Sequence, residues 1–569
     1  MAFQLSPGVL VSEVDLTTVV PSVATTVGGI AGDFQWGPVN QEVTIGNEIQ
    51  LVNTFGKPDS NTANAFFTAA NFLSYGNDLR VVRSIGTNGR NAVSNGSAVL
   101  IANNAVYEAS YSSNTSTLIY AKYPGALGSN LRIAFADANN FSSFQWEDQF
   151  DSTPNTSPFV TLKTGSYVAN DEMHVVIIDD TGTFSGGVAG TVLEKFAYVS
   201  KASDAKNPDG SDNFYKNVIN SRSKYLYWGG HPTANVNANT NWGLVSTVVS
   251  ANGAQNTYHT ISGNATVSTG SSGVSDAPTD GNLDTSYDLF SNPDSSDVSL
   301  LMAGATNANT IPNYLISIAE SRKDCMVFVS PKYADVVNNA TPDTAIVTTA
   351  DGITKSSFAV MDSGWKYQFD KYNDVYRWVP LNGDIAGLCV RTDLERDPWF
   401  SPAGLQRGVI KNVIKLAWNP TKANRDKIYK AGVNPVVSFP GEGTILYGDK
   451  TLQNRPSAFD RINVRRLFIV LEKSIAKAAR SSLFEFNDEF TRAAFVNLVE
   501  PFLRDIKGRR GIYDYKVICD TTNNTPEVID QNNFVGDIYI KPARSINFIQ
   551  LNFVAVRTGV SFEEIVGSV

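Results

Sequence analysis

The sequence contains few of the residues on which most metal sites and many enzymes depend. Its 569 residues include only three histidines and three cysteines. No HExxH motif and no cysteine or histidine spacing typical of a zinc site occurs. The three cysteines, Cys325, Cys389 and Cys519, are far apart and odd in number, which favours buried free thiols over a disulfide framework. We therefore expect no bound metal and no cofactor.

Long apolar runs and an excess of basic charge are also missing. No run of about 18 apolar residues is present, which excludes an obvious membrane span. The first residues, "MAFQLSPGVL", lack the basic region and apolar core of a signal peptide. We expect a soluble protein that is made in a cytoplasm and does not insert into a membrane. The net charge of −9 disfavours a general nucleic-acid-binding surface.

The sequence also lacks the common catalytic motifs. It has no GxSxG element, and Gly441-Glu442-Gly443 lacks the third glycine and the following helix of a nucleotide loop. Asp179-Asp180 and Glu563-Glu564 are adjacent carboxylates, and neighbours in a strand point to opposite faces. Such pairs are unsuited to acid/base catalysis, so we expect no enzymatic activity.

What is present indicates a globular protein of several domains. Hydrophobic residues make up 42% and charged residues 18% of a chain that is long enough for two to four domains. Residues 297–307, "DVSLLMAGATN", have the pattern of a buried strand, and 311–331 continue as a helix and a second strand. This order predicts a parallel α/β layer, and the whole chain is expected to be mixed α/β with β-rich parts.

Two amphipathic helices are expected near the C-terminus. Residues 463–484 place apolar side chains on one face, and Arg466, Lys473, Lys477 and Arg480 on the other. A second helix is expected over 487–508, with Asn487 or Asp488 as its N-cap, and strands follow at 511–520 and 537–556. The basic face is either a binding surface or an ordinary solvated helix face.

Both ends of the chain have the alternation of a strand. Near the N-terminus, Val14 and Leu16 alternate with acidic residues, and near the C-terminus Ile549, Leu551 and Phe553 alternate with polar ones. A strand needs a partner for its backbone groups. Residues 9–16 either fold back onto 23–31 as a local hairpin or pair with another chain, and the residues alone favour neither.

Composition shifts along the chain predict the following domains. An N-terminal arm covers 1–20 and a C-terminal arm covers 546–569. Between them we expect a middle α/β domain (21–90 and 196–400, with a polar exposed excursion at 233–298), an inserted β-rich domain (91–195) and a C-terminal α/β domain (401–545).

Several stretches resemble one protein family. "LSPGVLVSEVD" (5–15) resembles the N-terminal arm of the contractile tail sheath proteins of bacteriophages, and "AKYPGALGSNLRI" (121–133) resembles a loop of that family. "NPVVSFPGEGTILYGDKTL" (434–452) and "FDRINVRRLFIVLEKSI" (459–475) resemble its C-terminal domain, and "INFIQLNFVAVRTGVSFEEI" (546–565) its closing arm. The resemblance is to the T4-like group and is weakest at 138–190 and 233–298.

The resemblance implies an answer for the terminal strands. In these sheath proteins both arms add strands to the C-terminal domains of neighbouring subunits, a form of strand addition. It therefore assigns inter-subunit contacts to Val9, Val11, Glu13, Val14, Leu16, Ile549, Leu551 and Phe553. It also implies a middle domain of subtilisin-like layout without protease function, an insertion that faces outward, and a C-terminal domain that faces the tail tube. Arg466, Lys473, Lys477 and Arg480 are then candidates for contact with acidic tube residues.

The function implied is that of a structural subunit that polymerises helically around the tail tube and contracts to drive it through the host envelope. The expected partners are further copies of the chain, the tail tube protein, and the baseplate and tail terminator proteins, with no nucleic acid. The expected location is the virion tail, after assembly in the host cytoplasm. The alternatives are the sheath of a phage-derived injection device, a β-rich surface adhesion protein and a degenerate hydrolase.

Overall fold

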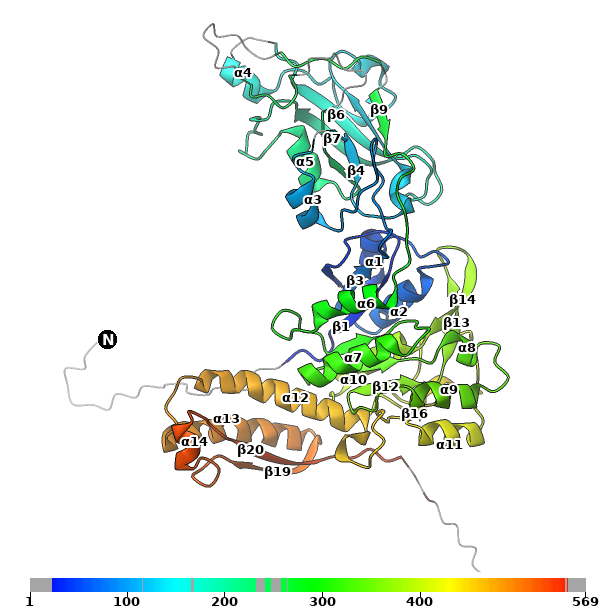
Figure 1. Cartoon of the computed structure of the whole chain (residues 1–569), viewed down its shortest axis with the longest axis vertical. Helices are drawn as coiled ribbons and strands as arrows, with labels where there is room; N and C mark the ends of the chain where they lie inside the picture. Colours follow the sequence, from blue (N-terminus) through cyan, green and yellow to red (C-terminus); the bar gives the residue numbers. More distant parts are fainter. Residues whose placement is uncertain are drawn as a thin grey trace, which may run out of the picture. The chain divides into compact units, whose positions relative to one another are not determined.

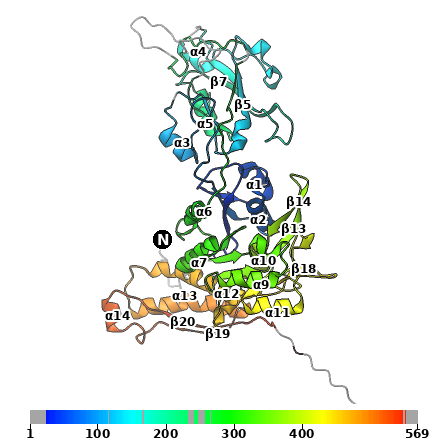
Figure 2. The same cartoon turned by 45° about the vertical axis from the view of Figure 1, so that its right-hand side comes forward.

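The structure is a computed structural model that describes residues 23–114, 116–164, 168–231, 241–246, 257–263, 265–547 and 550. The chain divides into two compact units, each with its own helices and strands (Figures 1 and 2). The larger unit holds the described residues up to Pro398 together with Pro402–Ser474. The smaller unit holds Trp399–Ser401 and the described residues from Ile475 onward.

A seven-stranded sheet forms the centre of the larger unit. Its strand order is β16-β12-β11-β10-β1-β3-β2, and all neighbours are parallel except β2 and β3. The strands are β1 (Gly28–Asp33), β2 (Glu42–Ile45), β3 (Leu79–Ser84), β10 (Leu300–Met302), β11 (Met326–Val329), β12 (Ala359–Asp362) and β16 (Val433–Asn434). The central strands β10 and β11 are apolar along their whole length because helices cover both faces of the sheet.

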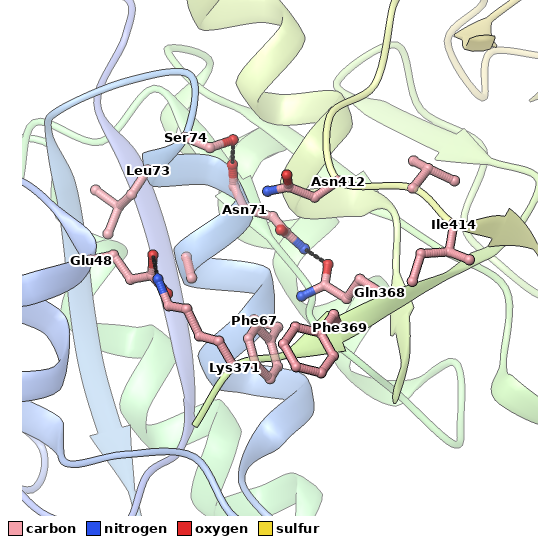
Figure 3. Close-up of a pocket in the computed structure, with 12 residues that line it drawn as sticks. Glu48, Phe67, Asn71, Leu73, Ser74, Gln368, Phe369, Lys371, Asn412 and Ile414 are labelled. Carbon is pink, nitrogen blue, oxygen red and sulfur yellow. Dashed lines mark hydrogen bonds and ion pairs between the residues drawn. The ribbon is translucent and has the colours of Figure 1, made fainter. Parts of the chain in front are cut away.

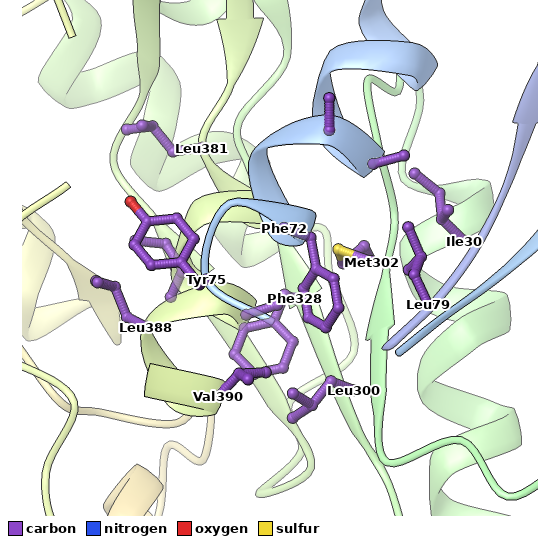
Figure 4. Packing of buried hydrophobic residues seen from close by; sticks show 14 of the residues in the cluster. Ile30, Phe72, Tyr75, Leu79, Leu300, Met302, Phe328, Leu381, Leu388 and Val390 are labelled. Carbon is purple, nitrogen blue, oxygen red and sulfur yellow. The ribbon is translucent and has the colours of Figure 1, made fainter. Parts of the chain in front are cut away.

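Successive residues of each strand point into two different cores. Ile30 and Phe328 lie in the core shown in Figure 4, whereas Ala31 and Val327 lie in the core on the opposite face. Side chains of α1 (Glu48–Phe55), α2 (Ala63–Leu73), α10 (Asn382–Glu395) and the start of α12 (Ile462–Ala479) complete the first core. The second core includes side chains of α6 (Asp280–Tyr287), α7 (Thr310–Arg322), α8 (Tyr333–Val336), α9 (Pro342–Asp351) and α11 (Lys422–Lys430).

Glycines of β1 allow α2 to pack directly on the sheet. A Cβ at Gly28 would lie 2.5 Å from Cζ of Phe72, and a Cβ at Gly32 would lie 2.6 Å from Cβ of Ala65. The expected α/β layer is confirmed nearby, since β10, α7 and β11 follow one another and the two strands pair in parallel.

The inserted domain has its own antiparallel sheet with the order β7-β6-β5-β9. These strands are β5 (Leu131–Ala136), β6 (Glu172–Asp179), β7 (Thr191–Ser200) and β9 (Ala265–Ser268). A second pair joins β4 (Ile119–Ala121) to β8 (Leu226–Trp228). The helices of this region are α3 (Asn104–Ser110), α4 (Pro158–Thr164) and α5 (Tyr215–Arg222), with short 3-10 turns at Ala126–Asn130, Phe141–Ser143 and Glu147–Gln149.

The predicted end of the insertion at residue 195 is wrong. Tyr215 and Trp228 lie in the core of the inserted domain, and β9 pairs with β5 of its sheet. The predicted polar excursion at 233–298 is also wrong for part of its described residues, because Tyr287 and Phe290 are buried in a core of the main sheet. The strand β9 belongs to the segment by which the chain returns from the inserted domain to the main sheet. It is only four residues long and lies within a polar stretch of the sequence.

The remaining strands of the larger unit lie after α9. β14 (Val375–Pro380), β13 (Trp365–Asp370) and β15 (Lys415–Leu416) form a three-stranded antiparallel sheet, and β17 (Val436–Phe439) pairs with β18 (Gly443–Leu446). Because β16 is part of the main sheet and Pro402–Ser474 belong to the larger unit, the predicted domain boundary at residue 401 is wrong. The short turns Asp288–Phe290 and Ala458–Asp460 are 3-10 helices.

The smaller unit contains the end of α12, the 3-10 turn Arg480–Ser482, α13 (Glu489–Gly508), α14 (Pro526–Asp530) and the strands β19 (Ile512–Ile518) and β20 (Asp537–Pro542). The N-cap of α13 is Asp488, whose side chain accepts a hydrogen bond from the Thr491 N–H at 2.8 Å. This confirms one of the two expected N-caps. Pro501 lies inside α13, which continues through it.

Candidate assembly surface

A two-stranded ribbon is the main feature of the smaller unit. β19 (Ile512–Ile518) and β20 (Asp537–Pro542) pair antiparallel, with Asp514 opposite Lys541. The register shifts between Ile512 and Asp514, which marks a bulge at the start of β19. Strands were expected at 511–520 and 537–556, and β19 and β20 lie within these ranges.

The two faces of the ribbon differ in chemistry. One face packs beside α13 (Figure 1). There the Tyr515 hydroxyl donates to the Glu500 carbonyl at 3.4 Å. The half-buried residues of this face are Tyr515, Val517, Ile538 and Ile540. The exposed residues of the other face are Asp514, Lys516, Tyr539 and Lys541. The helix α13 therefore covers one face of the ribbon, and the other face is exposed.

The edges of the ribbon are open in the part of the chain that the structure describes. The sheet contains β19 and β20 alone, so each strand has one edge without a neighbouring strand. Two-stranded ribbons are marginally stable in water, and an unpaired edge is a template for a further strand. The ribbon can thus accept one strand on each side by backbone hydrogen bonding.

Trp399 anchors the start of β19. Its indole Nε1 donates to the Arg509 carbonyl at 3.2 Å, and the Arg509 guanidinium lies 5.2 Å from the ring centre. Gly511 permits this packing because a Cβ there would come within 2.6 Å of Ile506 Cγ2 and 3.1 Å of Trp399 Cδ2. The sequence pattern gave no sign that Trp399, 113 residues before β19, belongs to this unit.

The predicted strand donors lie outside the described residues. These are Val9, Val11, Glu13, Val14 and Leu16 of the N-terminal arm, and Ile549, Leu551 and Phe553 of the C-terminal arm. The structure therefore describes the ribbon β19–β20 but not the predicted donor strands, and strand addition between subunits stays a prediction.

Arg466 was predicted to lie on an exposed basic face, and this prediction is wrong. Its side chain is 3% exposed and donates to both carboxylate oxygens of Asp393, at 2.7 and 2.6 Å. The Thr25 hydroxyl also donates to Asp393, at 2.6 Å. Burial alone would lower the pKa of Arg466, but the Asp393 carboxylate outweighs that effect and raises it. The periodicity of α12 placed Arg466 away from the apolar stripe, but it could not show that α10 supplies a buried carboxylate.

The other three residues of the predicted basic face are more accessible. Lys473 is partly buried and forms an ion pair with Asp297, so its charge is already compensated within the larger unit. Lys477 and Arg480, in the smaller unit, are exposed. The exposed part of the predicted basic face therefore consists of Lys477 and Arg480.

Buried polar groups fill the carboxyl edge of the main sheet. In open α/β folds this edge is the usual ligand site. Here the Ser330 hydroxyl donates to Asp362 at 2.6 Å, and the fully buried Lys366 ammonium donates to Asp384 at 2.9 Å. Burial raises the pKa of Asp362 to about 8, although hydrogen bonds from Ser330 and the Gly364 N–H act in the opposite direction. At this edge Ser330 is thus hydrogen-bonded to Asp362, and Lys366 to Asp384.

The packing of His174 indicates a structural role for this residue. The buried His174 ring stacks on Phe150 at 4.0 Å, its Nε2 lies 2.9 Å from the Ser152 carbonyl, and burial lowers its pKa. Among the described residues, no three histidine, cysteine, aspartate or glutamate side chains gather as a metal site would require. No helix in the described ranges is long and apolar enough to cross a membrane.

Family models match most of the folded regions. The phage tail sheath protein central domain matches residues 292–452, and the phage tail sheath C-terminal domain matches 454–555. The tail sheath protein Gp18 domain III N-terminal region matches residues 25–83. These matches, together with the mixed α/β fold and the open ribbon, define a structural protein of a phage tail.

Relatives match over the full length. The tail sheath protein of Enterobacteria phage T4 is 36% identical, with 99% of each chain covered, and that of Vibrio phage KVP40 is 34% identical, with 99% of this chain and 100% of the relative covered. The chain belongs to the phage tail sheath protein family. It is a structural subunit of a contractile tail sheath and a component of the virion.

Two crystal structures share the fold at low sequence identity. The sheath tail protein from Desulfitobacterium hafniense has a TM-score of 0.52 at 12% identity and covers 90% of this chain and 94% of its own. The sheath tail protein from Listeria innocua has a TM-score of 0.51 at 10% identity, with 92% and 96% covered. Both support the mixed α/β arrangement of several domains.

Proposed function

We propose that copies of this chain join by strand addition into stacked rings that wind helically around a tail tube. The observation that carries this proposal is the ribbon β19–β20, whose two open edges can each accept a strand. The alternating segments at the two ends of the chain are the donors with matching character. A contact of this kind is head-to-tail, so it propagates into a helix rather than closing as a dimer.

Strand donation suits a polymer that changes its packing. A donated strand holds its neighbour through backbone hydrogen bonds, while the segment that leads to it acts as a tether. The folded units can then rotate and slide without losing contact between subunits. In this mechanism the free energy of contraction comes from the subunit contacts of the contracted state. No nucleotide hydrolysis is required, and the subunit has a structural and not an enzymatic role.

The domain roles follow from the same mechanism. The C-terminal region faces the tail tube, the inserted domain faces outward, and the α/β layer is scaffold with a subtilisin-like layout. The filled carboxyl edge around Asp362 and Asp384 supports the scaffold role. Assembly takes place in the host cytoplasm, with baseplate and tail terminator proteins at the two ends of the sheath.

Electron microscopy of the purified full-length protein tests the proposed function. Negative-stain images are expected to show striated tubes or stacked rings, because each subunit carries both donor and acceptor. A solution of monomers at every concentration and salt condition would contradict self-assembly through strand addition.

The exposed basic residues of the smaller unit are expected to contribute to tube binding. Charge reversal at Lys477 and Arg480 together should weaken co-assembly with the tail tube about tenfold, because each exposed ion pair is worth a fraction of a kcal/mol to about 1 kcal/mol. Co-sedimentation of sheath protein with preformed tubes measures this. Charge reversal of the exposed Lys224 in the inserted domain is the matched control. Equal binding by all three proteins would leave the basic residues as a solvated helix face.

A further inference from the structure

A groove in the larger unit lies between α2 and the edge of the β13–β15 sheet. It is a cavity of about 500 Å³, within the range of binding pockets. Phe67 and Leu73 of α2 line one side, and Phe369 and Ile414 line the other (Figure 3). Asn71 donates to Gln368 at 3.0 Å across the base of the groove, so these two buried amides bind each other. The surface that remains is mixed, with these apolar walls beside the polar side chains of Glu48, Ser74 and Asn412.

The sheet edge beside the groove is incomplete. β15 pairs only with Lys366 and Tyr367 of β13, so Phe369 has no neighbouring strand on that side among the described residues. The side chains of Phe369 and Ile414 are 45% and 55% exposed. Exposed apolar residues around a cavity typically mark a contact surface.

Lysines surround this groove. Lys371 lines it, and its ammonium lies 2.9 Å from a Glu48 carboxylate oxygen. Lys411 and Lys415 are exposed nearby, and the Lys411 ammonium donates to the carbonyl of Ser74, which also lines the groove. The groove therefore favours an apolar occupant with carboxylates beside it.

The apex segment, residues 483–490, runs from the end of the 3-10 turn Arg480–Ser482 into the first two residues of α13 and has the complementary chemistry. Its apolar side chains are 62–105% exposed: Leu483 (62%), Phe484 (105%), Phe486 (84%) and Phe490 (82%). Glu485, Asp488 and Glu489 lie among them and are also exposed. This is the densest run of exposed large apolar side chains in the described part of the chain.

The backbone of the apex segment also indicates a contact. Phe484 has a φ of 71°, in the left-handed region that residues other than glycine seldom adopt. This conformation coincides with a fully exposed aromatic ring. Strain combined with an exposed ring is typical of a segment whose shape serves binding rather than the stability of the isolated subunit.

We propose that the apex segment of one subunit inserts Phe484 and Phe486 into the groove of a neighbouring subunit. The occupant is a second copy of this chain because the apolar rings match the walls, and the carboxylates of the apex match the lysines of the groove. The two surfaces are different parts of the chain, so the contact is head-to-tail and propagates into a helix. The proposal rests on the proposed sheath assembly and adds a contact that is independent of the terminal arms.

Disulfide trapping tests this contact directly. The variant F484C/I414C, assembled into tubes and mildly oxidised, is expected to give a ladder of covalent multimers on a non-reducing gel. Mixed tubes of F484C and I414C single variants should give covalent dimers only. Background from the native thiols is low because all three are buried, and burial raises the pKa of Cys325 to about 12 and of Cys389 to about 11.

The matched control is F484C/L162C, since Leu162 is 87% exposed but lies in the inserted domain. Tubes that form without a ladder from F484C/I414C, or with an equal ladder from the control, would overturn the contact while leaving sheath assembly intact. Absence of tubes from the wild-type protein would overturn the sheath assembly itself, and the contact with it. As a second measure, F484S/F486S should raise the critical concentration for tube formation about tenfold, because assembly then no longer buries two aromatic rings.

Discussion

Replacing Asp393 by alanine is expected to destabilise the unassembled subunit by about 3–5 kcal/mol. The variant leaves the guanidinium of the buried Arg466 without its bidentate carboxylate partner. An uncompensated buried charge is among the most costly single defects in a folded protein. Urea unfolding followed by tryptophan fluorescence measures the change.

Two control variants separate this effect from a general loss of contacts. The double variant D393A/R466M should recover much of the lost stability, because it removes the buried charge together with its partner. D351A should cost less than about 1 kcal/mol, since the Asp351 side chain is 66% exposed and lies 3.6 Å from Lys355, four residues further along the chain. A loss below 1 kcal/mol for D393A itself would mean that water reaches Arg466 in the folded subunit.

Deleting residues 1–20 is expected to abolish tube formation while the rest of the subunit stays folded. The deletion removes the proposed N-terminal donor strand but retains Thr25, whose hydroxyl donates to Asp393 and whose carbonyl accepts from Arg466 at 3.4 Å. Negative-stain microscopy and sedimentation velocity of the deletion variant beside the full-length chain measure the loss.

The deletion also distinguishes the two interpretations of the N-terminal strand. If residues 9–16 folded back locally, deletion would lower the stability of the subunit. Of the segment 23–31, only residues 23–27 are left to pair with them, because β1 already lies between β10 and β3. If residues 9–16 are donated to a neighbour, circular dichroism and the urea midpoint should stay unchanged. Tubes of normal appearance from the deletion variant would contradict a role for the N-terminal arm in assembly.

The regular elements of the fold were predictable because their local signals agree with the tertiary structure. The order strand, helix, strand at 297–331 and the N-cap at Asp488 are confirmed by β10, α7, β11 and α13. In these segments the apolar period, the capping residue and the final packing all indicate the same element.

The wrong predictions share a physical origin, which is contact between residues distant in the sequence. β9 pairs with β5 across more than 120 residues, yet it lies in a polar stretch that suggested an exposed loop. Arg466 is on the polar side of its helix by periodicity, but Asp393 of α10 neutralises it in the interior. Trp399 belongs to the smaller unit through its packing against Gly511. No local pattern carries information on such partners.

The filled carboxyl edge of the main sheet has a consequence for phage genetics. Substitutions at Asp362, Lys366 or Asp384 would break buried hydrogen bonds that join β12 to Ser330 after β11, and β13 to α10. Their effect in an infected cell would be a lower amount of folded subunit, and this loss would grow on warming because unfolding accelerates with temperature. Temperature-sensitive mutants of the virus are therefore expected to concentrate at this edge, where an α/β enzyme would instead show mutants that fold normally but lack activity.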